Sequence, residues 1–231
     1  MRISKTLKYI LSSLLLFSVF SASGQEIEVV TEKPKENKVV NGLSLGVDVA
    51  PLIIIPFEPG RIGIGFLGRY LFNQDWFVVG EMGFENVNVD KKTYEYKSNG
   101  GFLKLGMDYN FFHVNEPGNN DNITVGIRYG IATQNHQSPG YTVIDDYWGD
   151  YTGSFGKSNV TSNWMEVVFG LRTEVVKNFF MGWSFRMKML IKAHTSNVQE
   201  PYTIPGYGKW DNKVNMGFTY TLEYQIPFKK N

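Results

Sequence analysis

The feature that most constrains the fold is a strict alternation of side-chain types on both sides of a short Lys-Asn turn at residues 177 and 178. Before the turn, one face carries Met165, Val167, Phe169, Leu171, Thr173 and Val175. After it, the same face carries Met181, Trp183, Phe185, Met187, Met189 and Ile191. A period of two sustained on both sides of a turn predicts a long β-hairpin. A three-residue turn would place Gly170 opposite Arg186 and Phe169 opposite Met187, and a slip by one residue would turn every side chain to the other face.

The same alternation recurs along most of the chain. It predicts further strands at residues 43–50, 62–70, 76–85, 103–111, 123–131 and 214–228. Together with the hairpin they predict an all-β fold, a closed antiparallel up-and-down transmembrane β-barrel of about eight strands. The net charge of +1 does not suggest a nucleic-acid partner. The absence of cysteine excludes disulfides, thiolate chemistry and a lipoprotein anchor.

The N-terminus has the pattern of an export signal. Arg2, Lys5 and Lys8 precede an apolar core and the small residues at 22–24. Residues 1–24 are therefore predicted to be a cleaved signal peptide, 25–40 a flexible periplasmic tail and 41–231 the barrel. We expect the protein in the outer membrane of a Gram-negative cell.

The connections between strands alternate in length. The longest, 134–162 and 195–212, follow odd-numbered strands, and short ones follow even-numbered strands. Long loops of outer-membrane barrels lie outside the cell, which would leave both termini in the periplasm. The segment Pro205, Gly206, Tyr207, Gly208 and Lys209 is a candidate extracellular loop that either binds a partner or packs over the barrel mouth.

Alternation does not by itself tell which face points outward. In a soluble lipocalin-like barrel the apolar face would surround an apolar ligand. Bulky side chains such as Trp76, Trp183 and Phe185 would overfill an eight-stranded barrel, however, and the glycines of the polar face would make room for charged neighbours in a narrow lumen. The membrane arrangement is favoured, and the soluble barrel is the alternative.

A polar lumen requires its charges to be paired. The inward acids are expected to be Asp48, Glu81, Glu85, Asp108, Glu166, Glu174 and Glu223. The inward bases are expected to be Arg69, Lys104, Arg128, Arg172, Arg186, Lys188 and Lys192. Such a plugged, ion-paired interior predicts no open channel.

Aromatic residues near the short turns fit an interfacial girdle. They are Phe72, Trp76, Phe111, Phe112, Phe179, Phe180 and Phe228. A terminal aromatic such as Phe228 is also typical of the signal that barrel-assembly machinery reads, although Lys229, Lys230 and Asn231 follow it here. The expected partners are therefore membrane lipid, the assembly machinery and an unidentified extracellular ligand, and the barrel is expected to be a monomer.

No residues indicate a catalytic, cofactor or metal site. His113, His136 and His194 lie on separate connections without metal-ligand spacing, and the acidic loop 145–150 lacks the order of a calcium loop. A small-barrel lipid-modifying enzyme using His194 or Ser196 is an alternative. The main expectation is a non-enzymatic barrel with a structural role, or one that binds through its extracellular loops.

Several short motifs carry a family resemblance. They are Gly126-x-Arg128-Tyr129, Trp164-x-Glu166 with Phe169-Gly170, Gly182-Trp183-Ser184 with Arg186, and residues 204–209, Ile-Pro-Gly-Tyr-Gly-Lys. In these the chain resembles the uncharacterised Bacteroidetes outer-membrane β-barrel family known as domain of unknown function 6048. The resemblance implies an outer-membrane location and brings no activity or catalytic residues.

Overall fold

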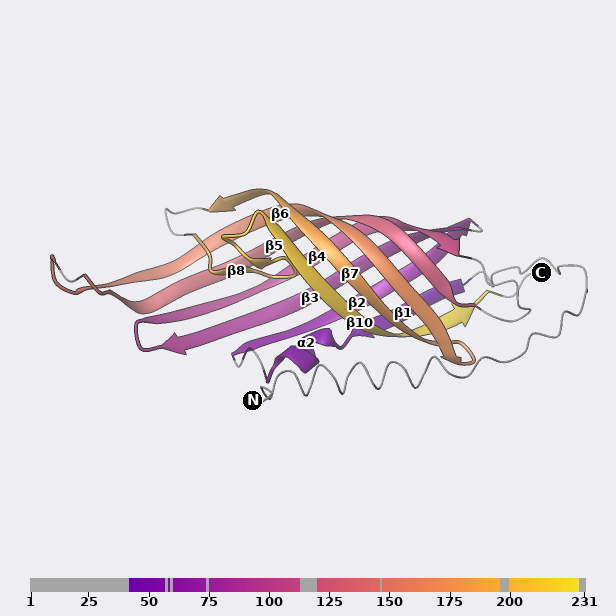
Figure 1. Cartoon of the computed structure of the whole chain (residues 1–231), viewed down its shortest axis with the longest axis horizontal. Helices are drawn as coiled ribbons and strands as arrows, with labels where there is room; N and C mark the ends of the chain where they lie inside the picture. Colours follow the sequence, from indigo (N-terminus) through magenta and orange to yellow (C-terminus); the bar gives the residue numbers. More distant parts are fainter. Residues whose placement is uncertain are drawn as a thin grey trace, which may run out of the picture. The chain divides into compact units, whose positions relative to one another are not determined.

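The structure is a computed structural model that describes residues 42–56, 58, 60–73, 75–112, 120–145, 147–195 and 200–228. The predicted signal peptide, the tail and Ser196 lie outside these residues. Eight strands form a closed antiparallel barrel in the order β1-β10-β7-β6-β5-β4-β3-β2 (Figure 1). The strands are β1 (Gly42–Asp48), β2 (Arg61–Asn73), β3 (Trp76–Lys91), β4 (Tyr94–Phe112), β5 (Asn122–Val143), β6 (Tyr151–Val176), β7 (Phe179–Thr195) and β10 (Val214–Pro227). The short helix α2 (Ala50–Ile54) follows β1, and β8 (Thr203–Ile204) pairs with β9 (Gly208–Lys209). The predicted all-β, eight-stranded, up-and-down barrel is confirmed.

The predicted hairpin is β6 and β7, but its register differs from the prediction. A two-residue turn joins the strands, with Asn178 at φ 65°, and the pairing shifts between Glu174 and Val176. Gly170 is therefore opposite Ser184, and Phe169 is opposite Phe185. The predicted partners were wrong by two residues, a shift that keeps each side chain on its predicted face.

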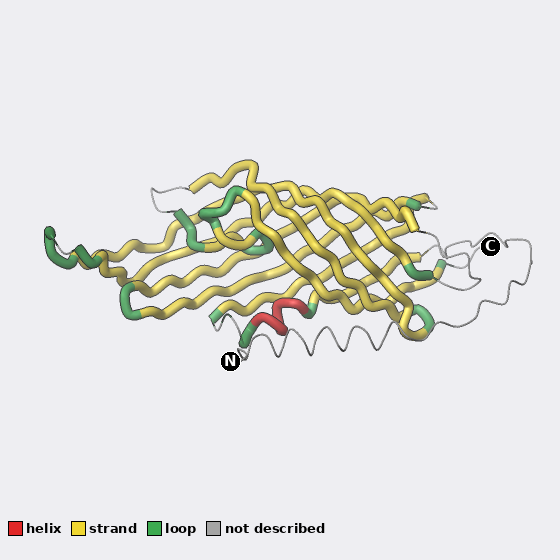
Figure 2. Tube along the Cα trace, in the orientation of Figure 1, coloured by secondary structure: helices red, strands yellow, loops and turns green. Residues whose placement is uncertain are grey.

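Several predicted loops are strands. β5 continues to Val143 and β6 begins at Tyr151, so most of 134–162 is paired backbone. β3 and β4 likewise extend beyond the barrel and are joined by the two residues between Lys91 and Tyr94. Figure 2 shows these four strands running on past the rest of the sheet. The sequence does not reveal these strand segments, because both of their faces carry polar residues and the alternation of apolar with polar side chains is lost.

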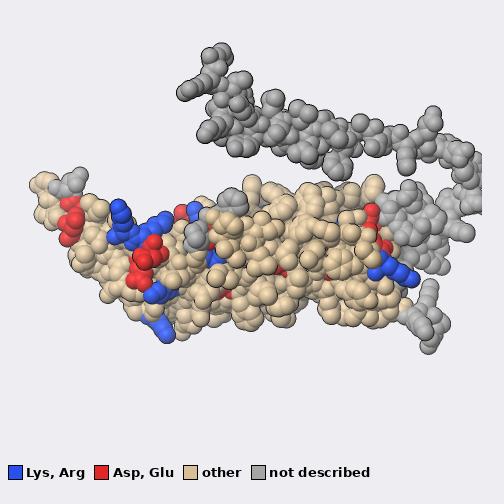
Figure 3. Space-filling model, turned by 90° about the horizontal axis from the view of Figure 1, so that it is seen from below, with Lys and Arg blue, Asp and Glu red and all other residues tan. Residues whose placement is uncertain are grey.

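The apolar face of the barrel points outward. Leu105, Ile127 and Phe185 are 59%, 59% and 45% exposed, whereas Lys104, Arg128 and Arg186 on the opposite face are buried. In Figure 3 the charged side chains gather towards the two ends, leaving a mainly uncharged band between them. This orientation is opposite to that of a soluble barrel that encloses an apolar ligand.

The inner face also contains apolar packing. Near the short turns, Leu67, Leu71, Phe77 and Val79 form a buried cluster. Phe180 belongs to the lumen as well: it is 1% exposed, and the Arg172 guanidinium lies 3.4 Å from its ring centre. Its predicted place in the girdle was wrong, because Phe179 takes the outward position and Phe180 necessarily turns inward. The other predicted girdle residues are exposed.

None of the helices among the described residues has the length and apolar character needed to cross a membrane.

Candidate functional site

A continuous chain of ion pairs occupies the barrel lumen. It starts where Arg172 meets Glu223 at 3.0 Å, and Arg69 lies 3.7 Å from the same carboxylate. Arg69 is also 3.0 Å from Asp108, which contacts Arg128 at 2.7 Å. These contacts join β6, β10, β2, β4 and β5 across the interior, although the residues are far apart in sequence.

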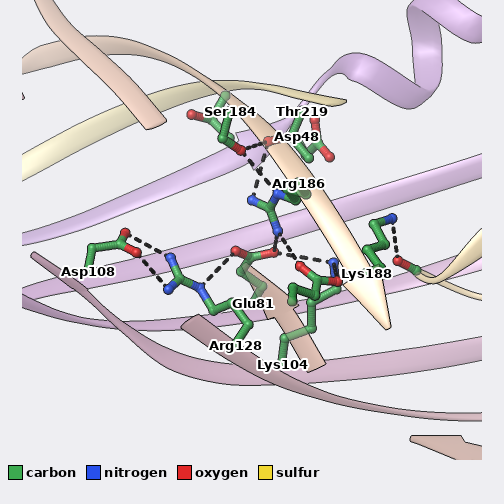
Figure 4. A network of polar contacts seen from close by, with 12 residues as sticks. Asp48, Glu81, Lys104, Asp108, Arg128, Ser184, Arg186, Lys188 and Thr219 are labelled. Carbon is green, nitrogen blue, oxygen red and sulfur yellow. Dashed lines mark hydrogen bonds and ion pairs between the residues drawn. The ribbon is translucent and has the colours of Figure 1, made fainter. Parts of the chain in front are cut away.

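The ion-pair chain continues through two glutamates towards the barrel end opposite the Lys177 turn, which we call the outer mouth because it is predicted to face out of the cell. The Arg128 Nε lies 3.5 Å from the Glu81 carboxylate. Arg186 contacts the carboxylate of Glu81 at 2.7 Å (Figure 4). It also contacts the carboxylate of Glu166 at 3.2 Å. Lys104 reaches the same two acids at 3.6 and 3.0 Å. Because alternate inward positions of neighbouring strands meet in a narrow barrel, opposite charges can neutralise one another away from water.

The remaining predicted lumen residues lie at the margins of this ion-pair chain. Asp48 accepts hydrogen bonds from the backbone N–H groups of Ala50 and Tyr220. Glu174 accepts hydrogen bonds from Asn120 and from the backbone of Asn178, near the turn. Glu85 is paired at 3.0 Å with Arg61, a base that the sequence analysis missed because it precedes the recognisable alternation of its strand.

Two predicted bases differ from the expected pairing. Lys188 points inward, but its Nζ donates to the backbone carbonyls of Gly206 at 2.8 Å and Tyr207 at 3.3 Å. Lys192 is exposed, so its assignment to the lumen was wrong. The pairing of β6 with β7 shifts at Asn163 and Trp164, and this irregularity breaks the alternation before Lys192.

Glycine makes room for the central ion pairs at Gly126. A β-carbon at this position would collide with the carboxylate of Asp108 and would lie 3.0 Å from the Arg128 guanidinium. The absence of a side chain therefore lets β4 and β5 bring this pair together. Two cavities beside these ion pairs hold only about 20 and 30 Å³, room for about one or two water molecules each.

The segment Pro201–Trp210, which we call the plug, closes the outer mouth. Ile204 and Tyr207 are buried together with Trp164 and Ala132, and the Tyr207 and Trp164 ring centres are 5.7 Å apart. Gln134 donates to the Thr203 carbonyl at 2.8 Å. Of the two roles predicted for residues 205–209, the structure shows packing into the mouth, with Lys209 exposed at its rim.

Among the described residues, no group of three or more histidine, cysteine or acidic side chains could hold a metal ion. In the acidic loop, Asp145 instead accepts hydrogen bonds from the backbone N–H groups of Tyr147 and Trp148, which lower its pKa. His136 is buried between the rings of Tyr96 and Phe155, and burial lowers its pKa.

Solved structures that are similar to the chain share little sequence with it. Ail, the attachment invasion locus protein of Yersinia pestis, is 11% identical with a TM-score of 0.41, over 82% of this chain and 99% of that one. A major outer membrane protein from Thermus thermophilus is 10% identical with a TM-score of 0.42, over 80% and 99%. Neisserial surface protein A is 12% identical with a TM-score of 0.35, over 82% and 96%.

No curated protein matches the sequence. A family model does match it, over residues 6–231, which includes every strand of the barrel. The chain belongs to the family described as Domain of unknown function (DUF6048).

Proposed function

We propose that this protein is an integral β-barrel of a Gram-negative outer membrane, with a closed lumen and a structural or binding role outside the cell. The observation that carries the proposal is the outward apolar face, which combines exposed aliphatic and aromatic side chains with a buried, charged interior. Such a barrel is stable in lipid, because its outward side chains are apolar and its backbone N–H and C=O groups are paired between strands around most of the circumference.

The lumen supports a closed barrel rather than a conducting pore. The ion-pair chain crosses the interior, the cluster of Leu67 and Phe77 lies at one end, and the plug closes the other. We therefore expect no conductance when the purified protein is added to planar bilayers. Steady channel openings that persist at high protein purity would contradict the closed lumen.

The extension of β3 to β6 is the part that offers surface beyond the membrane. The band of exposed apolar residues ends near Ile131 on β5, and the strand continues to Val143. We infer that the barrel anchors this extension in the membrane and that the extension binds an extracellular ligand. We assign no catalytic role to the protein. Three further features also stay predictions: recognition by the barrel-assembly machinery, a cleaved signal peptide and a Bacteroidetes origin.

The membrane placement is tested by fractionation of cells that express the full chain. The protein should remain in the membrane after carbonate extraction and should migrate differently on gels with and without boiling. Recovery from the soluble periplasmic fraction would refute the proposal.

Orientation is tested by proteolysis of intact cells. The β5–β6 extension should be cut, at sites between Val143 and Tyr151, while the turn at Lys177 should be protected until the cells are lysed. The opposite pattern would place the extension in the periplasm.

A further inference from the structure

The barrel wall is incomplete over its outer half, between β2 and β10. β1 ends at Asp48, whose partners are Gly65 on β2 and Thr221 on β10. On their other edges, β2 stays paired out to Arg61 and β10 out to Val214. In the part of the chain that the structure describes, no strand lies between 61–64 and 214–219. We call this opening the wall gap; α2 packs against the two strands that border it (Figure 1).

The wall gap lies at the level of the apolar band. Ile62 and Ile64 on one side, and Met216 and Phe218 on the other, are exposed apolar residues. Open strand edges at such a depth are tolerated only where protein covers them or where they line a polar cavity. The five residues of α2 are too few to replace the missing length of strand on both sides.

A cavity of about 510 Å³ opens at the wall gap. Charged side chains of both signs line it: the acids Asp48, Glu58 and Glu85 and the bases Arg61, Lys104 and Lys188. The exposed apolar side chains of Met216 and Phe218 also line it. The volume is in the range of small-molecule sites, roughly 300–1,000 Å³. The cavity therefore joins charged side chains of the lumen to apolar side chains of the outer face.

One cation at the lumen end, Lys188, has no acidic partner among the ion pairs of the described residues. Both described partners of the Lys188 Nζ are neutral backbone carbonyls of the plug, and the described residues place no carboxylate within ion-pair distance of it. The acids that line the cavity have other partners: Glu58 and Glu85 pair with Arg61, and Asp48 accepts hydrogen bonds from the backbone N–H groups of Ala50 and Tyr220. A partly buried cation whose described partners are all neutral favours a bound anion.

We propose that the wall gap binds an anionic amphiphile. Its carboxylate or phosphate head contacts Lys188 inside the wall, and its acyl chain leaves past Met216 and Phe218 into the membrane. Gly217 contributes by leaving room for the lysine, since a β-carbon there would lie 2.7 Å from the Lys188 Cε. The inference rests on the membrane placement proposed above, which supplies the lipid that the chain would enter.

The test measures binding to the purified barrel in a neutral detergent. The probes are oleate, lysophosphatidic acid, methyl oleate, which lacks a charge, and inorganic phosphate, which lacks a chain. Oleate or lysophosphatidic acid should bind saturably, and whichever binds more tightly identifies the head group. Methyl oleate and phosphate should each bind at least tenfold more weakly than that amphiphile.

Three variants assign the site. Lys188→Met should weaken binding of the amphiphile about tenfold, whereas Lys188→Arg should stay within about threefold of the native chain. Lys192→Met is the matched control, because it removes an exposed lysine from the same strand, and it should leave binding unchanged. Each variant is used only if its gel shift on boiling shows a folded barrel.

Four outcomes would overturn the proposal. They are equal binding by Lys188→Met and the native chain, tight binding of phosphate alone, tight binding of methyl oleate, and no saturable binding of either amphiphile. As a second readout, a photoreactive fatty acid should label α2 and the outer half of β10 in preference to the opposite wall. Since binding is measured in detergent, its failure is distinct from a failure of membrane localisation in cells.

Discussion

At the scale of single residues, Arg186 makes several of the polar contacts in the outer part of the lumen. It donates to Glu81 and Glu166, and its Nε donates to Ser184 at 3.0 Å. Arg186→Met should destabilise the barrel by about 3–5 kcal/mol, because it leaves buried carboxylates only partly compensated. Urea unfolding in lipid vesicles measures this loss.

An exposed ion pair provides the control for Arg186. Lys97 and Glu95 are 2.6 Å apart, with side chains 45% and 36% exposed. Lys97→Met should cost no more than about 1 kcal/mol, because water already screens the pair. Equal losses for Lys97→Met and Arg186→Met would mean that the lumen network contributes little to stability.

His136 makes the outer extension sensitive to acid. Its folded pKa is below the ordinary value of 6.5, because burial disfavours the charged ring. The unfolded chain therefore binds the proton more readily, so stability is lost as the pH falls through 6.5 towards the folded pKa. Limited proteolysis at pH 7.5 and about 5.5 should show faster cleavage of the extension at the lower pH. Ordinary carboxylates titrate below this pH range, so they do not contribute to the difference.

His136→Phe should remove that dependence without a large cost at pH 7.5. Neither ring nitrogen has a hydrogen-bond partner among the described residues, so the substitution removes no described polar contact. A pH response that is unchanged in this variant would assign the acid sensitivity to another group.

At the scale of elements, the plug contains two glycines with positive φ, Gly206 and Gly208, and Gly206 is the more tightly packed. Gly206 has φ +73°, and a β-carbon there would lie 2.7 Å from the Phe102 ring. Gly206→Val should displace the plug and increase its cleavage by protease while the barrel keeps its gel shift, since strand pairing does not involve this residue. Gly156→Val is the control, because its β-carbon would meet nothing within 4 Å. Cleavage that is the same in both variants would show that the plug does not require this conformation.

At the scale of the whole molecule, the apolar band decides whether the barrel can enter a membrane. Phe185 lies in this band and is 45% exposed. Phe185→Asp should reduce the membrane-inserted, heat-modifiable fraction, because a charge facing lipid costs on the order of 1–3 kcal/mol. Phe185→Leu keeps an apolar surface and should insert normally. Normal insertion of Phe185→Asp would mean that this face does not contact lipid.

Much of the architecture could be predicted from the sequence because alternation is a local property. In β7, the outward Met181, Trp183 and Phe185 and the inward Gly182, Ser184 and Arg186 are already assigned to their faces by a period of two. A closed ring of such strands then brings inward charges together, which is why acids and bases from distant segments meet in the lumen.

The remaining features depend on contacts between strands. The register of β6 and β7, the inward position of Phe180 and the exposure of Lys192 follow from a turn and from pairing irregularities that alternation does not record. The extension of β3 to β6 is held by backbone hydrogen bonds, which form irrespective of side-chain polarity. The plug carbonyls at Lys188 and the wall gap beyond Asp48 arise only when the ring closes, because they join segments that have no local relation. The sequence by itself therefore determined which face of each strand is apolar, and the tertiary structure decided which charges pair and where the wall stays open.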